Sequence, residues 1–260
     1  MSSATAATLE VFHADSLAGP LGAIKKAYEA KHPGTTIKLT GGTSRALADR
    51  ILAGEHCDVF APSSSAIANE LVTKNAAPWS IVFSANEMVV ITAKGNPKGI
   101  KLASDLAKPG VKFTRITGDK DLGTGRTVEF LKRATTAEGH ADLAQKIVDA
   151  APADGAKPQS VPMTVAAVKE GKADAGVVYY SAAVAAKNDI EIIRFPANVN
   201  LSEAIQNAAN VPGTAKSPKE ATDLVRFLLS QEGRDILLQT GQPPVVPPIR
   251  KGNVPPELAN

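Results

Sequence analysis

Short apolar strand signals alternate with helix signals along the first 75 residues, and this alternation limits the folds that the chain can adopt. The apolar segments are Leu9 to His13, Thr36 to Leu39 and Cys57 to Ala61. The helical segments run from about Leu17 to His32, from Thr43 or Ser44 to about Ala53, and from Ser63 to Asn75. Strands and helices that alternate at this spacing form parallel strand pairs with right-handed crossovers. The sequence therefore predicts an α/β fold.

A second α/β lobe is predicted after residue 80, where the pattern changes and then restarts. Ile81 to Phe83 and Met88 to Ile91 are two apolar strands separated by a short polar gap. The elements expected after them are strands at 112–116, 175–179 and 190–195 and helices at 123–133, 138–151 and 164–170. These segments are enough for a second sheet with helices of its own.

The last quarter of the chain is expected to return to the first lobe, because it has no partner sheet of its own. It has strand character from Leu201 and is helical from Pro218 to Thr240, while residues 242–260, with six prolines, indicate an extended tail. The predicted lobes are residues 9–84 with 197–260, and residues 85–196. Each is expected to hold a mixed, mainly parallel sheet, and the chain is expected to cross between them near residues 82–88 and 193–200.

Composition excludes several classes of function. An apolar fraction of 43% and a charged fraction of 21% are typical of a globular protein with ample volume for a core. A net charge of +3 is too small for a nucleic-acid-binding surface, and 4% aromatic residues argue against a stacking platform for single strands. A weak positive charge does attract small anions.

The N-terminal residues and the single cysteine bear on where the protein works. Cys57 has no second cysteine to pair with, and we expect it to be a small buried apolar residue. No apolar run approaches the roughly 18 residues of a membrane-spanning helix. Residues 1–8 lack the basic and apolar regions of a signal peptide, but Ala4 to Ala6 has the small-x-small pattern of a cleavage site. The segment is either the start of a mature secreted protein with an added Met or a short disordered tail.

Hydroxyl residues stand where helices are expected to begin, which is where doubly wound α/β folds bind ligands. These are Ser16, a natural N-cap, then Thr43 with Ser44, then Thr124 to Thr127, and finally Ser160 before Val161. Helix N-termini offer unpaired N–H groups and a partial positive charge, and neutral donors of this kind suit a tetrahedral oxyanion. The alternative is that each hydroxyl only caps its helix.

Three motifs in a fixed order resemble one known family. They are His13 to Leu17 after the first strand, Gly41 to Ser44 after the second, and the C-terminal run Phe227 to Arg234 followed by Gly241 to Pro244. Together they resemble the periplasmic molybdate/tungstate-binding proteins of ABC importers, over most of residues 9–250. The resemblance implies the two-lobed type II periplasmic-binding-protein fold, with a hinge of two crossovers. It also implies a monomeric, periplasmic receptor without catalysis or cofactor, whose partners are an oxyanion and a membrane permease.

In the first lobe, the resemblance assigns ligand-contacting hydroxyls to two turns. Ser16 keeps the serine of the first turn, whereas Asp15 replaces the small residue that is usual there. An aspartate that faced the ligand would repel a dianion, so we expect Asp15 to point outward or to cap the helix. Thr43 and Ser44 both fit the second turn, and Ser44 is the favoured one.

In the second lobe, Asp121 to Thr127 resembles the family's DPxGYR-type loop, with Gly125 at the aromatic position. Arg126 could clamp an oxyanion with two hydrogen bonds, or it could form a salt bridge to Asp121 or Glu129 that fixes the loop. Thr124, Gly125, Thr127 and Val161 are expected ligand contacts from their places at helix starts, and the resemblance adds Tyr179 at a strand end. Asp121 matches a carboxylate that joins the metal's coordination in the archaeal branch. Val178 replaces the second such carboxylate, which favours simple oxyanion binding with no direct metal ligand.

Four functional hypotheses remain open from the sequence. The first is a receptor for molybdate or tungstate, and the second is a receptor for sulfate or for a small phosphorylated or carboxylated organic anion. The third is an enzyme on the same fold with Cys57 holding a cofactor or acting as nucleophile, although no histidine or carboxylate pattern supports it. The fourth is an effector domain of a transcription factor, but no helix-turn-helix module precedes it. The histidines have no metal-ligand spacing.

Overall fold

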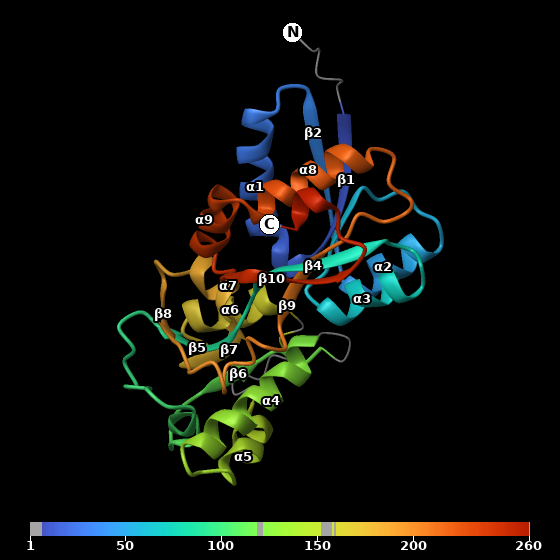
Figure 1. Cartoon of the computed structure of the whole chain (residues 1–260). Helices are drawn as coiled ribbons and strands as arrows, with labels where there is room; N and C mark the ends of the chain where they lie inside the picture. Colours follow the sequence, from blue (N-terminus) through green and yellow to red (C-terminus); the bar gives the residue numbers. More distant parts are fainter. Residues whose placement is uncertain (1–6, 119–121, 152–157, 159, 260) are drawn as a thin grey trace. The chain divides into compact units, whose positions relative to one another are not determined.

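The chain divides into two compact units in the computed structural model, which describes residues 7–118, 122–151, 158 and 160–259 (Figure 1). The first unit is Met1–Ala85 with Ala204–Asn260, and the second is Asn86–Glu203. The return to the first unit lies seven residues beyond the expected boundary at 196/197. Asn200 holds these residues in the second unit, since its side chain donates to Glu87 (2.7 Å) and its carbonyl oxygen accepts from the N–H of Met88 (2.9 Å). The division into two ligand-binding lobes stays a prediction.

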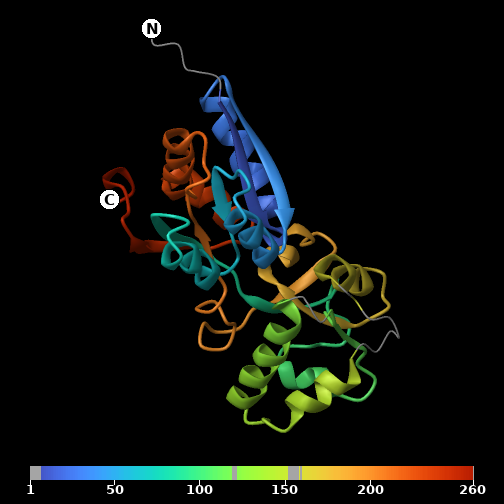
Figure 2. The same ribbon diagram turned by 90° about the vertical axis from the view of Figure 1, so that its right-hand side faces the viewer.

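The first unit contains the predicted parallel sheet, with strand order β2-β1-β3. Its strands are β1 (Ala7–Ala14), β2 (Thr35–Gly42) and β3 (Val59–Ala61). Both pairings of β1 are parallel, as the alternating pattern predicts, and β1 lies beside β2 in both views (Figures 1 and 2). His13 pairs with Gly41 on one side and with Ala61 on the other, so the three strands end at the same edge of the sheet.

A second, antiparallel sheet of the first unit corrects the expectation of an extended tail. Its strand order is β10-β4-β9, with β10 (Pro244–Gly252), β4 (Trp79–Ala85) and β9 (Gln206–Ala209). Residues 249–252 of the expected tail pair with residues 79–82 of β4. Proline lacks an N–H and is tolerated in an edge strand, which is the place that β10 takes. A bridge between Phe60 and Asn210 joins the two sheets of this unit.

Helices cover the sheets of the first unit. They are the 3-10 turn η1 (Asp15–Leu17), α1 (Ala18–Lys31), α2 (Ser44–Leu52), α3 (Ser65–Thr73), α8 (Pro218–Leu229), α9 (Gln231–Gln239) and the 3-10 turn η3 (Pro256–Leu258). The single helix expected over 218–240 is wrong, because it is interrupted at Ser230. Ser230 is extended (φ −67°, ψ 165°), and its hydroxyl accepts from the N–H of Gly233 (3.2 Å) as the N-cap of α9.

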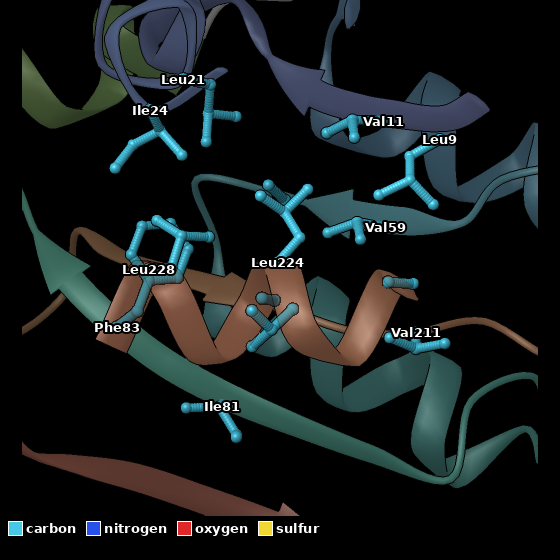
Figure 3. Packing of buried hydrophobic residues seen from close by; sticks show 14 of the residues in the cluster. Leu9, Val11, Leu21, Ile24, Val59, Ile81, Phe83, Val211, Leu224 and Leu228 are labelled. Carbon is cyan, nitrogen blue, oxygen red and sulfur yellow. The ribbon is translucent and has the colours of Figure 1, made fainter. Parts of the chain in front are cut away.

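The largest apolar core of the first unit lies between α8 and the sheets (Figure 3). Leu224 and Leu228 of α8 are 3% and 2% exposed and belong to the same buried cluster as Val11, Val59 and Phe83. Full burial of side chains of this size contributes about 1.5–3 kcal/mol each. The C-terminal segment therefore completes the core that the N-terminal strands begin.

The second unit is a four-stranded sheet with order β6-β7-β5-β8. Its elements are β5 (Met88–Ala93), η2 (Ala103–Ala107), β6 (Phe113–Arg115), α4 (Leu122–Ala137), α5 (Leu143–Ala150), α6 (Val161–Lys169), β7 (Ala175–Tyr179), α7 (Tyr180–Ala185) and β8 (Ile190–Ile193). β6 and β7 are parallel, whereas β5 is antiparallel to both β7 and β8. This sheet is mixed, as predicted, but contains more antiparallel pairing than expected. The short helix α7 was not predicted.

Asp58 joins β1 to the start of α8 and is completely buried. One carboxylate oxygen accepts from the N–H groups of Lys216 (2.9 Å) and Ser217 (3.0 Å). The other accepts from the N–H of Glu10 (2.9 Å) and lies 3.0 Å from Nε2 of His56. Burial raises the pKa of Asp58, but these donors outweigh burial and hold its pKa below the ordinary value of 3.8.

Asp58→Asn is expected to lower the free energy of unfolding by about 1–3 kcal/mol at pH 7, because the new NH2 group would face backbone donors. Since the folded pKa lies below the unfolded one, the carboxylate's contribution is complete above pH 4 and is lost as the pH falls through the folded pKa. Urea unfolding at pH 7 and pH 3 should therefore show a gap between wild type and variant that narrows in acid. Asp142→Asn, at an exposed pair with Lys146, is the control and should leave the midpoint unchanged. Equal midpoints for wild type and Asp58→Asn at pH 7 would contradict this role.

Gly233 marks the close contact between α8 and α9. A Cβ at this position would lie 2.2 Å from the carbonyl oxygen of Phe227 and 2.6 Å from that of Leu228. We expect Gly233→Ala to cost about 1–3 kcal/mol of stability in chemical denaturation, since α9 would have to move. At Gly22 in α1 nothing lies within 4 Å of a Cβ, so Gly22→Ala should be neutral or stabilising by about 0.5–1 kcal/mol. The prediction fails if the two variants have the same stability.

Candidate functional site

The carboxyl ends of β1, β2 and β3 lead into three turns that contain hydroxyl residues. Ser16 lies in η1 after β1, Thr43 and Ser44 follow β2, and Ser63 follows β3. Because the three parallel strands end at one edge, these turns lie along the same edge of the first unit. Ligands of doubly wound folds bind at this edge.

Ser44 and Ser63 are in direct contact in the first unit. Ser44 is buried at 5% exposure, and its hydroxyl accepts from the N–H of Ser63 (3.1 Å), with the two hydroxyl oxygens 3.4 Å apart. The capping function belongs instead to Thr43, whose hydroxyl accepts from the N–H of Ala46 (3.3 Å). The alternative that these hydroxyls only cap a helix therefore holds for Thr43 but not for Ser44.

Ser16 does not cap a helix either, which corrects the expectation that it is the N-cap of α1. The N-cap of α1 is Leu17, and Ser16 lies inside the 3-10 turn that precedes the helix. This extra turn moves the helix start beyond Ser16, so its side chain makes no capping hydrogen bond. Ser16 is half-buried, and no hydrogen bond of its hydroxyl is found within the described part of the chain.

Asp15 and His13 lie against Gly41 of β2. A Cβ at Gly41 would be 2.9 Å from Oδ1 of Asp15 and 3.3 Å from Cε1 of His13, so a larger residue there would require the Asp15 side chain to move. His13 is buried, and its Nδ1 donates to the carbonyl oxygen of Ala14 (2.8 Å). Asp15 is exposed and does not cap the turn, whose N-cap is Ala14. A carboxylate therefore lies beside this edge of the sheet.

In the second unit, the predicted loop residues are the first turns of α4. The hydroxyl of Thr124 donates to the carbonyl oxygen of Gly118 (2.7 Å), which connects the start of α4 to the segment after β6. Gly125 is exposed, and nothing lies within 4 Å of where its Cβ would be, so the backbone there is open to a ligand. Thr127 is fully buried, and its hydroxyl has no hydrogen-bond partner among the described residues. Asp121 lies outside the described residues.

Arg126 contacts Tyr179, the last residue of β7. Its Nη1 donates to the phenol oxygen of Tyr179 (3.0 Å), and its guanidinium carbon lies 5.7 Å from the centre of the ring. Tyr179 is 7% exposed, and Arg126 is half-buried. Glu129, one of the two salt-bridge partners expected for Arg126, forms an ion pair with Arg133 (2.8 Å). The structure therefore brings together two predicted ligand-binding residues of the second unit.

Val161 is the first residue of α6 and is half-buried. The N-cap, Ser160, makes no side-chain capping bond, and Pro162 follows Val161. The N–H groups of a first helical turn have no partner within the helix, so this end of α6 offers donors to an anion.

Ser63 was missed by sequence reasoning. It follows the short strand β3 in the run Pro62 to Ser65, and this run of hydroxyls after a third strand was the signal that could have found it. It is interesting for the site because its N–H and hydroxyl both lie at the hydroxyl of Ser44.

Cys57 has none of the properties of a nucleophile. It is completely buried, and its thiol donates to the carbonyl oxygen of Val59 (3.2 Å). Burial raises the pKa of the thiol to about 12, so it is protonated at neutral pH. In the described residues, no group of three or more metal-ligating side chains could hold a metal ion, and no helix is long and apolar enough to span a membrane.

The family of the chain follows from a family model. The model for a bacterial extracellular solute-binding protein matches residues 9–242, so the chain belongs to this family. Among its relatives are a solute-binding protein of Methanoculleus marisnigri, 27% identical over 96% of this chain and 85% of that protein, and molybdate-binding protein ModA of Mycobacterium bovis. ModA is 27% identical over 91% of this chain and 84% of its own length.

Solved structures of similar fold support the predicted fold class. A substrate-binding domain assigned to a molybdenum ABC transporter of Clostridium difficile has a TM-score of 0.74 at 20% identity and covers 92% of this chain and 99% of that one. The sulfate-binding protein SubI of Mycobacterium tuberculosis has a TM-score of 0.69 at 18% identity, with 92% and 88% covered. PEB3 with L-phospholactate bound has a TM-score of 0.67 at 17% identity and covers 90% of this chain and 99% of that one. The type II periplasmic-binding-protein fold is confirmed, and the relatives are solute-binding proteins.

Proposed function

We propose that this protein is an extracytoplasmic receptor that binds a tetrahedral oxyanion, molybdate or tungstate, and passes it to the permease of an ABC importer. The family of the chain and the relative named as molybdate-binding support this proposal. The receptor acts as a monomer in the periplasm and catalyses no reaction.

The proposed ligand class rests on two serine hydroxyls of the first unit that are not used as helix caps. Ser16 and Ser44 lie beside the ends of parallel strands, and neither caps a helix. Neutral O–H and N–H donors can surround an anion with charge-assisted hydrogen bonds without a competing counter-charge. Thr43, Thr124, Thr127, Val161 and Tyr179 are the further contacts that we propose.

A second candidate is a receptor for a small phosphorylated or carboxylated organic anion, or for sulfate. Arg126 favours this candidate, because a guanidinium binds carboxylates and phosphates with two parallel hydrogen bonds. Nothing lies within 4 Å of where a Cβ of Gly125 would be, which suits a ligand larger than a tetrahedral oxyanion. Related folds have been solved for a sulfate-binding protein and with phospholactate bound.

A calorimetric panel of molybdate, tungstate, sulfate, phosphate and phospholactate separates these candidates. We expect molybdate or tungstate to bind most tightly, and at a hundredfold excess over its Kd to stabilise the protein by about 2.7 kcal/mol in a thermal-shift assay. Binding of phospholactate alone would establish the second candidate in place of the first. No binding of any of the five anions would contradict both.

Ser44→Ala is expected to weaken binding of the best anion about tenfold or more, because a hydrogen bond to a charged group contributes about 1.5–3 kcal/mol. The matched control is Ser230→Ala, which removes the cap of α9 and should lower stability by about 1 kcal/mol without changing the affinity. If Ser44→Ala binds as tightly as Ser230→Ala, Ser44 does not contact the anion.

Substitutions of Arg126 and Tyr179 test the residues from the second unit. Tyr179→Phe should weaken binding through loss of the hydroxyl, and Arg126→Lys should weaken it by about tenfold, because an ammonium cannot reproduce a planar two-pronged contact. Isothermal titration of both variants and of the double variant measures their coupling, which should be non-additive for groups 3.0 Å apart. Full affinity in Arg126→Ala would remove Arg126 from the site and leave the first-turn N–H groups of α4 with Tyr179.

A further inference from the structure

Gln242 belongs to the motif Gly241 to Pro244, which the function proposed above leaves without a role. Gln242 lies in the first unit, in the short segment of the chain that links α9 to β10, and it is completely buried. The side-chain amide makes two polar contacts. Nε2 donates to the carbonyl oxygen of Ser16 (3.4 Å), and Oε1 accepts from Nδ2 of Asn207 (2.7 Å).

Pro20 removes one of the two backbone donors that helical geometry offers to the carbonyl oxygen of Ser16. In an α-helix, a carbonyl oxygen accepts from the N–H four residues further along, whereas in a 3-10 turn such as η1 the N–H lies three residues along, which is that of Gly19. Four residues after Ser16 stands Pro20, which has no N–H, so the α-helical bond cannot form. The amide of Gln242 supplies an N–H to the same oxygen from a residue 226 positions away in the sequence.

A chain of buried polar groups fixes the orientation of the Gln242 amide. Nδ2 of Asn207 in β9 donates both to Oε1 of Gln242 and to the hydroxyl of Ser84 in β4 (2.9 Å). Asn207 and Ser84 are both completely buried. With its oxygen directed at Asn207, the Gln242 amide can direct only its NH2 group toward Ser16. An inverted amide would place two oxygens against each other and leave buried groups unsatisfied.

We propose that Gln242 is the positioning residue of the Ser16 turn, and that through this turn it sets the affinity for the anion. The proposal rests on the proposed function, in which the hydroxyl of Ser16 contacts the anion. Gln242 does not touch the ligand. It supplies an N–H in place of the α-helical donor that Pro20 lacks, and so holds η1 in the conformation that presents the hydroxyl of Ser16.

The experiment restores the missing N–H. Gln242→Met keeps the length of the side chain and removes both polar contacts, and Pro20→Ala returns a backbone donor to position 20. Gln239→Met, at an exposed position of α9, is the matched control. Affinity for molybdate and tungstate is measured by calorimetry for wild type, both controls (Gln239→Met and Pro20→Ala alone), Gln242→Met and the Gln242→Met/Pro20→Ala double variant.

We expect Gln242→Met to weaken binding about tenfold, the double variant to recover most of that loss, and both controls to bind as wild type does. A merely structural role for Gln242 would not be rescued by a new N–H at position 20. Wild-type affinity in Gln242→Met, or a loss that Pro20→Ala does not reduce, would overturn the proposal. If Gln242→Met does not fold, Gln242→Asn takes its place, since its amide is too short to reach both Ser16 and Asn207.

Hydrogen exchange of the amides of residues 15–19, measured without ligand, separates this inference from the proposed function. Faster exchange in Gln242→Met, slowed again in the double variant, supports the positioning role even if the wild type binds neither anion. In that case the ligand assignment fails and the positioning of the turn stands. Unchanged exchange in Gln242→Met overturns the inference whatever the anion panel shows.

Discussion

The register of β1 with its two parallel neighbours sets the geometry of the first unit. His13 is paired with Gly41 and with Ala61, so three segments that are far apart in the sequence end at one edge. The turns after them bring Ser16, Ser44 and Ser63 to that edge. A slip of one residue in either pairing would turn the strand's side chains to the opposite face, and would remove both the core and the alignment of the turns.

Buried polar side chains complete backbone hydrogen bonding where the regular elements cannot. At the entry to β3, Asp58 accepts from N–H groups at the start of α8 and on β1. At the turn after β1, Gln242 donates to a carbonyl oxygen whose α-helical donor position is occupied by a proline. Buried backbone groups without partners are costly, so such side chains determine the exact path of the chain as much as the apolar core does. Both residues connect the N-terminal strands to the C-terminal third of the chain.

The sequence predicts the order of strands and helices well, because apolar periodicity reports local structure directly. It fails where a distant partner decides. The proline-rich segment after Gln242 has no strand signal, yet β10 forms because β4 offers an edge. Ser230 is compatible with a helix interior, and only the cap to Gly233 shows the break between α8 and α9.

The candidate site shows the same division between local and distant effects. A cap signal is local and cannot distinguish Thr43, which caps α2, from Ser44 beside it, which contacts Ser63. Serine is a favoured N-cap residue, but the 3-10 turn at Asp15 to Leu17 moves the start of the helix beyond Ser16. The contact between Arg126 and Tyr179 joins residues 53 positions apart, which no local pattern can indicate.

The antiparallel pairing of β4 with β9 determines how the second unit is inserted into the chain of the first. The chain leaves the first unit after Ala85 and returns at Ala204, and Ala85 is paired with Gln206. The exit and the return are therefore neighbours across one strand pair, as the two ends of a hairpin loop are. In topological terms, residues 86–203 are an insertion at the tip of a β-hairpin. A two-residue turn between Ala85 and Gln206 would close the first unit into one continuous chain that keeps both of its sheets and its hydroxyl-bearing edge.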